Sequence, residues 1–153
     1  MYASGKKASG GGFSSYLKAT FFAGGDVLDS TWTKMEFKGV AYDNDSEVDI
    51  VTNYRWDVAV DGVYRIFALA SLNSMPNTAN MGMNVKIYKN GSSLERGHQG
   101  VRCDDADALT SATHQTCLSL SAGDYIEVFV HQNTGVTKGI SSQANYMTAE
   151  RIA

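Results

Sequence analysis

The side chains best able to carry chemistry in this chain are its three histidines, His98, His114 and His131. None of them has a Ser or Cys nucleophile and a carboxylate at the short spacings that would indicate a catalytic site, although a triad can also assemble from distant positions. The sequence therefore does not predict an enzyme. We interpret His114 and His131 as surface or interface residues on strands.

Two acidic segments carry oxygen ligands of the kind that calcium prefers. They contain Asp104, Asp105 and Asp107, and Asp43, Asn44, Asp45 and Glu47, respectively. Neither segment has the glycine and the final glutamate of an EF-hand loop. Solvated loops are the simpler interpretation, and we expect neither a metal nor another cofactor.

Cys103 and Cys117 are the only cysteines. A disulfide is geometrically possible if they face each other on paired strands. In a reducing compartment, two small buried side chains are the simpler interpretation. Two cysteines without a nearby pair of further ligands do not predict a zinc site.

Exposed aromatic side chains could form a platform for a glycan. The candidates are Tyr42, Tyr54, Trp56 and Tyr88. Aromatic residues of a β protein more often belong to the core, so core packing is the simpler interpretation of all four.

The composition of the 153 residues limits the possible partners. The net charge is -3, from 13 basic and 16 acidic residues, and no basic run predicts binding to nucleic acid. No segment approaches the roughly 18 apolar residues that would cross a membrane. Residues 1–12 are rich in Gly and Ser and predict a flexible arm. They lack the apolar core of a secretion signal, so we expect synthesis in a cytoplasm.

The elements that would position these side chains are strands. Residues 54–68 alternate apolar and polar side chains up to a turn at Asp61-Gly62, and a second strand-like run follows. Strand and turn recur at 85–91, which ends in the hairpin signal Asn-Gly, and at 118–130. Roughly eight to ten short strands without helical periodicity predict an all-β, antiparallel sandwich or jelly roll.

Two of these strands carry specific expectations. Along 63–72, Ile66, Ala68 and Leu72 share one face, and Phe67 and Leu69 share the other. Both faces are apolar, so we expect burial on both sides. Over 30–43, charged residues alternate with apolar ones, which predicts one half-buried strand.

The ordered set of segments resembles the tumour-necrosis-factor-type (TNF-type) jelly roll of complement C1q globular heads, a module that bacterial and bacteriophage sequences share. The matching segments are FSSYL from Phe13, TWTKMEF around Trp32, YRWDVAVDGVYRI around Gly62 and Tyr64, VKIYKNG, LSAGDYIEVFV and the terminal YMTAERIA. The likeness covers residues 13–153, which we expect to form one jelly-roll domain.

The chain also departs from the animal members of that family. Val58-Ala59-Val60 stands where a proline is common, and Glu150 and Arg151 lie in a terminal strand that is usually apolar. Neither a collagen-like stalk nor a secretion signal precedes the domain. A phage-type member is therefore the better match.

The resemblance implies a homotrimer in which one sheet of the sandwich faces the three-fold axis. That sheet would contain the strand after Gly62, the strand near His114 and the last strand, with Tyr64 and Ile66 pointing into the sandwich. The interface residues implied in this way are Val63, Phe67, Leu69 and His114. A buried Phe and Leu would contribute on the order of 3–6 kcal/mol per subunit. Alternatively, Phe67 and Leu69 lie under a loop of the same subunit.

The phage-type resemblance implies a structural function. We expect a bacteriophage capsid decoration (cement) protein on the outer surface of the virion, made in the host cytoplasm. The homotrimer would contact the major capsid protein and bridge capsid subunits. The alternative is a receptor- or glycan-binding head domain of a phage tail fibre. Neither function requires a cofactor, a nucleic acid or a membrane.

Overall fold

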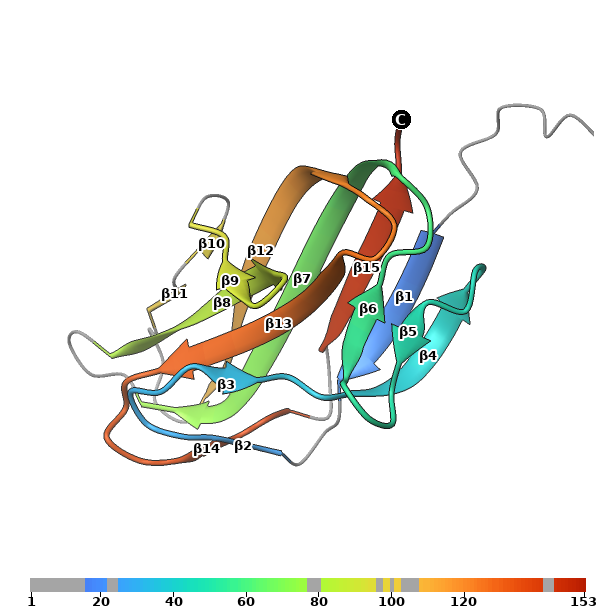
Figure 1. Ribbon diagram of the computed structural model, residues 1–153. Helices are drawn as coiled ribbons and strands as arrows, with labels where there is room; N and C mark the ends of the chain where they lie inside the picture. The colour runs from blue at the N-terminus through green and yellow to red at the C-terminus, as the bar shows by residue number, and fades with distance from the viewer. Residues whose placement is uncertain are drawn as a thin grey trace, which may run out of the picture.

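A computed structural model of the chain consists of strands and the turns between them (Figure 1). It describes residues 16–21, 25–76, 81–95, 98–99, 101–102, 108–141 and 145–153. The strands are β1 (Tyr16–Phe21), β2 (Asp26–Val27), β3 (Thr33–Lys34), β4 (Phe37–Asp43), β5 (Val48–Asp49), β6 (Arg55–Asp57), β7 (Gly62–Met75), β8 (Gly82–Lys89), β9 (Ser92–Ser93), β10 (His98–Gln99), β11 (Val101–Arg102), β12 (Ala108–Leu120), β13 (Tyr125–Gln132), β14 (Lys138–Gly139) and β15 (Tyr146–Arg151). Within these residues no helix is long and apolar enough to cross a membrane.

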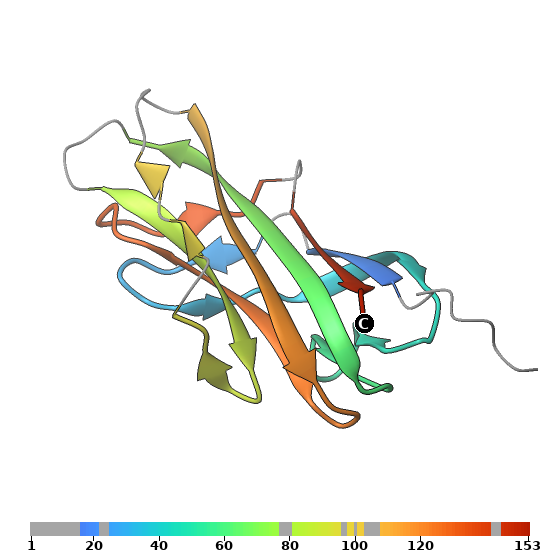
Figure 2. The same cartoon turned by 90° about the horizontal axis from the view of Figure 1, so that it is seen from above.

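The strands form two stacked antiparallel sheets, as Figures 1 and 2 show. The six-stranded sheet has the order β10-β12-β7-β15-β1-β4. The seven-stranded sheet has the order β11-β8-β13-β6-β5, with β3 added beside β13 and β9 beside β8. The prediction of an all-β, antiparallel jelly-roll sandwich is confirmed.

The segment 30–43 does not form the single strand that its alternation predicts. β3 pairs with β13 in the seven-stranded sheet, whereas β4 pairs with β1 in the six-stranded sheet. Met35, between these strands, and Phe37, the first residue of β4, are fully buried. The Met35 N–H donates to the carbonyl of Val128 at 2.8 Å. The chain therefore crosses from one sheet to the other at these two apolar side chains, and a regular alternation cannot reveal such a crossing.

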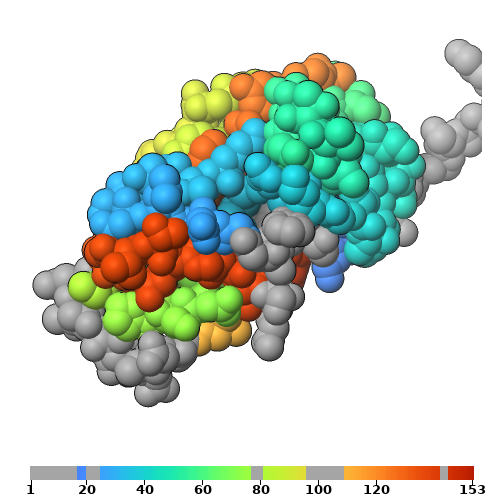
Figure 3. Space-filling view, turned by 90° about the horizontal axis from the view of Figure 1, so that it is seen from below, coloured from blue at the N-terminus to red at the C-terminus, as the bar shows by residue number. Residues whose placement is uncertain are grey.

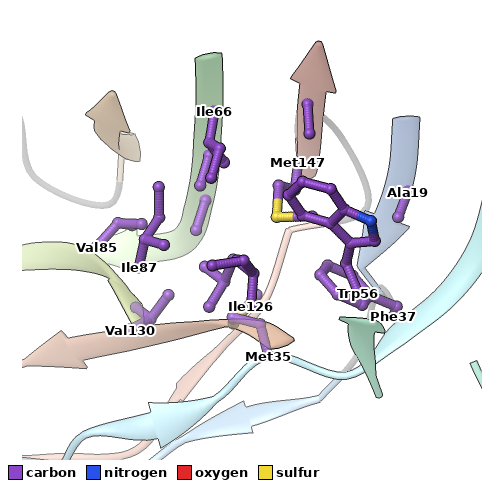
Figure 4. Close-up of a cluster of buried hydrophobic side chains, with 14 of the residues drawn as sticks. Ala19, Met35, Phe37, Trp56, Ile66, Val85, Ile87, Ile126, Val130 and Met147 are labelled. Atoms are coloured by element: carbon purple, nitrogen blue, oxygen red, sulfur yellow. The ribbon is translucent and has the colours of Figure 1, made fainter. Parts of the chain in front are cut away.

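The core lies between the two sheets (Figure 4). Ile66, Ala19 and Met147 project from the six-stranded sheet toward Ile126 and Trp56 of the other sheet. Alternation along each strand produces this arrangement because successive side chains of a strand point to opposite faces. On β7 the buried residues are Tyr64, Ile66, Ala68, Ala70 and Leu72. Phe67 and Leu69 on the other face are only half-buried in the single chain, so the burial expected on both sides is complete on one.

The hairpin predicted at Asn90-Gly91 is confirmed. Both residues have positive φ, 51° and 76°, as the tightest hairpin turns require. The Asn90 side chain also binds the neighbouring turn. Its Oδ1 accepts from the Tyr125 N–H at 2.8 Å, and its Nδ2 donates to Asp124 at 2.7 Å. This side chain therefore joins the turn after β8 to the start of β13.

One end of the sandwich is closed by the small sheet of β2 and β14. Figure 3 shows this end, where segments distant in sequence lie side by side. Ile140 bridges to Leu72, and the Lys138 ammonium donates to the carbonyl of Ser74 at 2.5 Å. These contacts attach the segment before β15 to the end of β7.

Candidate protein interface

The surface that best fits an interface is the outer face of the six-stranded sheet, defined here as the outward side of β12, β7, β15, β1 and β4. The buried residues of β7 point inward, so Val63, Arg65, Phe67 and Leu69 point outward. In the antiparallel ladder, Phe67 lies opposite Gln115 of β12 and Thr148 of β15, and Leu69 lies opposite Thr113 and Tyr146. The outward residues of the neighbouring strands therefore complete this face.

An aromatic pair lies at the centre of the outer face. The rings of Phe67 and Tyr146 have centroids 5.8 Å apart at an interplanar angle of 39°. The Lys18 ammonium lies 4.6 Å from the centroid of the Tyr146 ring, close enough for a cation–π contact. Phe67, Leu69 and Tyr146 are each only half-buried in this chain. Together they form an apolar centre that a second protein surface could cover.

A charged pair borders this apolar centre. Arg65 and Glu150 lie opposite each other on β7 and β15, and the guanidinium lies 3.5 Å from the carboxylate. Both side chains are more than half exposed. An apolar centre with a charged border is the usual composition of a protein interface.

A shallow groove of about 320 Å³ lies beside Glu150. It is lined by Leu17, Tyr42, Thr148, Ala149 and Glu150. Tyr42 lies on the edge strand β4 opposite Lys18 and is 42% exposed. The groove continues the outer face from β15 across β1 to the edge of the sheet.

The structure brings together three of the four residues that the sequence suggests for an interface. Val63, Phe67 and Leu69 all lie on the outer face. Contact with a second chain stays a prediction for all three.

The placement of His114 at an interface is wrong. His114 is fully buried, and its Nδ1 accepts a hydrogen bond from the Ile87 N–H of the other sheet at 2.9 Å. On β12, His114 lies opposite Ala68, an inward position, so its ring points into the sandwich. Small and polar residues occupy both faces of this strand, and its sequence pattern cannot distinguish them.

The other two histidines are not part of the outer face as described. His131 lies on the seven-stranded sheet, where its ring centroid is 5.2 Å from that of Trp32. The backbone of His98 forms β10 opposite His114, and its side chain lies outside the described residues.

The acidic segments have structural roles where they are described. Asp43 accepts a hydrogen bond from the Val48 N–H at 2.8 Å. Buried Glu47 accepts from Trp56 Nε1 and from the Ala59 N–H, both at 2.7 Å. Asp104, Asp105 and Asp107 lie outside the described residues. In the part of the chain that is described, no three His, Cys, Asp or Glu side chains come together as a metal site would require.

The aromatic candidates do not form one platform. Trp56 is fully buried against Tyr64, with ring centroids 5.2 Å apart. Tyr42 belongs to the outer face of the six-stranded sheet. Tyr88 packs against Phe129 on the seven-stranded sheet, 4.2 Å between centroids, and the Lys38 ammonium lies 3.9 Å from the Tyr54 ring. The four aromatic residues therefore lie at separate positions in the fold and do not make one surface.

Cys117 is exposed and free, so the expectation of a small buried side chain is wrong for it. It lies opposite Arg65 on the outward side of β12. Cys103 lies outside the described residues.

Sequence reasoning missed Tyr146, Lys18, Arg65 and Glu150 as members of the candidate interface. A signal was present in the terminal segment YMTAER, where Tyr146, Thr148 and Glu150 alternate with the buried Met147 and Ala149. That alternation identifies one outward row of side chains. It does not indicate that the row lies beside Phe67.

No protein-family model and no curated protein matches the sequence. Solved structures do match the fold. Murine APRIL at pH 8.5 aligns with a TM-score of 0.62 at 15% identity, over 90% of this chain and 98% of that chain. Eiger TNF from S. frugiperda aligns with a TM-score of 0.62 at 13% identity, over 91% of this chain and 94% of that chain.

The globular domain of zebrafish complement 1qA protein is also similar, with a TM-score of 0.58 at 14% identity, over 91% of this chain and 98% of that chain. At such identities the likeness shows the fold alone. The chain therefore has a C1q/TNF-like jelly-roll fold.

Proposed function

We propose that the protein is a homotrimeric capsid decoration protein of a bacteriophage, located on the outer surface of the virion. The observation that carries the proposal is the outer face of the six-stranded sheet, where Phe67, Leu69 and Tyr146 are half-buried in the single chain. The sequence resemblance assigns the sheet with β7, β12 and β15 to the three-fold axis. A trimer would bury this apolar centre in three equivalent places.

The energy available from this burial suits a stable assembly. Fully burying an exposed large apolar side chain contributes roughly 1.5–3 kcal/mol. Phe67 and Leu69 are already half-buried, so the trimer would gain about half of this from each, or about 1.5–3 kcal/mol per subunit from the two together. The Arg65–Glu150 pair at the border is partly exposed in the single chain. In a trimer it would fix the relative orientation of the subunits more than it would strengthen their association.

A trimer would act on a capsid through its symmetry. A closed three-fold assembly matches the three-fold and quasi-three-fold positions of an icosahedral shell. There, each subunit would contact the major capsid protein, and the trimer would stabilise the shell by adding contact area between neighbouring capsid subunits. This function uses no chemical reaction, and the support for the virus assignment is the phage-type sequence resemblance.

Two measurements test the two parts separately. Light scattering on the purified chain should give a mass near three times 16.5 kDa. A stable monomer would contradict the trimer. Phage particles that lack the protein should then break at lower temperature and milder osmotic shock than complete particles, and purified protein added back should restore their resistance.

Equal resistance of the two kinds of particle would contradict the decoration function even if the protein is a trimer. Binding of the purified trimer to host cells, without binding to capsids, would instead favour the receptor- or glycan-binding head of a tail fibre.

A further inference from the structure

His114 joins the two sheets from inside the sandwich. It lies on β12 of the six-stranded sheet and is fully buried. Its Nδ1 accepts a hydrogen bond from the backbone N–H of Ile87, on β8 of the seven-stranded sheet, at 2.9 Å. Figure 4 labels Ile87 among the core side chains between the sheets.

The backbone of Ile87 explains why a side chain is used here. Its carbonyl accepts from the Leu94 N–H at 3.0 Å, just beyond the short strand β9. The N–H and C=O of one strand residue point to the same side, so the Ile87 N–H also points toward this edge of the sheet. β9 pairs with Tyr88 and Lys89, and β11 pairs with Gly82 and Met83. The Ile87 N–H lies between the part of β8 that pairs with β9 and the part that pairs with β11, and the His114 ring binds it there.

This hydrogen bond determines where the ring carries its proton. A nitrogen that accepts a hydrogen bond through its lone pair cannot also carry a proton, so Nδ1 is bare and the neutral ring carries its proton on Nε2. A second proton on Nδ1 would place two N–H groups against each other. It would also place a positive charge at a fully buried position. The contact therefore requires the neutral ring.

The following charged and titratable groups on the neighbouring strands belong to the described residues. On β7 the opposite residue is Ala68, and the charged Arg65 points outward to Glu150. On β8, Lys86 points outward to Glu95. Lys89 pairs with Asp124. On β10 the opposite residue in the ladder is a second histidine, His98. The buried carboxylate of Glu47 binds Trp56 and Ala59, at other strands.

We propose that His114 is a pH-sensitive contact between the two sheets, which holds while its imidazole is neutral and is broken when Nδ1 takes up a proton. The proposal depends on the single chain and not on the proposed trimer. Its consequence has a definite sign. The unfolded chain takes up the proton near the ordinary histidine pKa of about 6.5, while the folded chain resists it. Acid therefore favours the unfolded chain, and the folding equilibrium constant falls by up to about tenfold per pH unit below that value.

The test replaces His114 with a residue that keeps the acceptor and cannot titrate. In His114→Asn, the side-chain oxygen can occupy nearly the place of Nδ1 and accept the Ile87 N–H. Urea unfolding is measured at pH 7.5 and pH 5.5 for the wild type and the variant. Between pH 7.5 and pH 5.5, the folding equilibrium constant of the wild type should fall, relative to that of His114→Asn, by a factor of up to about ten. His131→Asn is the matched control, since His131 lies on the outer side of the seven-stranded sheet and should keep the wild-type pH dependence.

Equal pH dependence of the wild type and His114→Asn would overturn the proposal. Repeating both series at a tenfold lower protein concentration separates the fold from assembly, because only dissociation of an oligomer depends on concentration.

A measurement on the wild type decides the question if the variant does not fold. Nitrogen NMR of the His114 ring at pH 7.5 should find the proton on Nε2 and Nδ1 bare. Between pH 7.5 and pH 5.5, the protection of the Ile87 amide against hydrogen exchange should fall, after correction for the intrinsic exchange rate. Lys86, opposite Phe129 on the same strand, is the control amide and should lose less protection. A proton on Nδ1 at pH 7.5, or equal loss at both amides, would overturn the proposal.

Discussion

Phe67 on β7 and Tyr146 on β15 pack against each other on the outside of the sandwich, with ring centroids 5.8 Å apart. The two rings come from strands that are separated by about half of the sequence and lie side by side in the sheet. Each is half-buried, although neither faces the core. An aromatic pair in this position is well suited to contact a second chain, because rings bury a large apolar area with few rotatable bonds.

The first prediction concerns this pair. Phe67→Glu places a charge in the centre of the outer face, and burying an unpaired charge in an interface is costly. We expect the mass from light scattering to fall from about three times to one times 16.5 kDa, with an unchanged circular dichroism spectrum. Phe129→Glu is the matched control, because Phe129 is a half-buried Phe on the seven-stranded sheet. If both variants lost the trimer, the cause would be a general loss of stability of the folded chain and not a charge in the outer face of the six-stranded sheet.

The second prediction concerns the buried carboxylate of Glu47. It accepts two hydrogen bonds at 2.7 Å, from Trp56 Nε1 and the Ala59 N–H. In Glu47→Gln, one of the two acceptor oxygens becomes an NH₂ group that faces a donor. We expect a loss of about 1–3 kcal/mol of unfolding free energy in urea at pH 7.

The control for Glu47→Gln is Glu36→Gln. Glu36 makes an exposed ion pair with Lys38 at 2.9 Å, and such pairs contribute little. Its substitution should change the unfolding free energy by less than about 0.5 kcal/mol. A similar loss in both variants would show that the hydrogen bonds of Glu47 are not the cause.

The third prediction concerns strong acid. The Asp49 carboxylate accepts hydrogen bonds from the backbone N–H groups of Thr52, Val51 and Asn53 at 2.8, 2.8 and 2.9 Å. These bonds lower the pKa of Asp49 to about 2, and the bond from the Thr52 N–H has the largest effect. Its folded pKa lies below its unfolded pKa, so its stabilisation is present above about pH 4 and is lost as the pH falls toward 2.

Asp49→Asn should therefore make the loss of stability between pH 4 and pH 2 less steep, as measured by thermal unfolding across that range. Thr52→Ala is the control, because it keeps the backbone N–H that binds the carboxylate and should keep the wild-type steepness. This range is well below the one in which His114 acts, and a pH series can resolve the two effects. An unchanged steepness in Asp49→Asn would contradict the prediction.

The fourth prediction concerns the turn at Gly91, where φ is 76°. A side chain in this region of backbone conformation costs about 1–2 kcal/mol. An added Cβ would also meet the Tyr125 hydroxyl at 3.3 Å. Gly91→Ala should lower the unfolding free energy by about this amount in a urea titration.

Gly139→Ala is the control for the turn. Gly139 has no positive φ, and an added Cβ there would have no heavy atom within 4 Å. We expect its substitution to change stability by less than about 0.5 kcal/mol. If both variants lost the same stability, backbone strain at Gly91 would not be the reason.

Part of the fold could be predicted because it depends on local patterns. The alternation along β7 correctly predicts that Ile66, Ala68 and Leu72 share one face and that Phe67 and Leu69 share the other. The family resemblance, and not the alternation, implied which of these faces points inward. The turn at Asn90-Gly91 could be predicted because few residues other than these adopt positive φ at low cost. The same local rule fails over 30–43, where the chain changes sheets at Met35 and Phe37.

The sequence by itself determined strands such as β7, the tight turn at Asn90-Gly91 and which residues of β7 share a face. Strand geometry and backbone sterics act between residues that are neighbours in the chain. Only the tertiary structure decided that His114 lies inside the sandwich, that Glu47 binds Trp56, and that Tyr146 lies beside Phe67. Alternation shows which residues of a strand share a face. It does not show which face is buried when both carry small polar residues, as on β12, nor which distant strand lies alongside. Those outcomes depend on how the whole chain minimises its exposed apolar surface and pairs its buried polar groups.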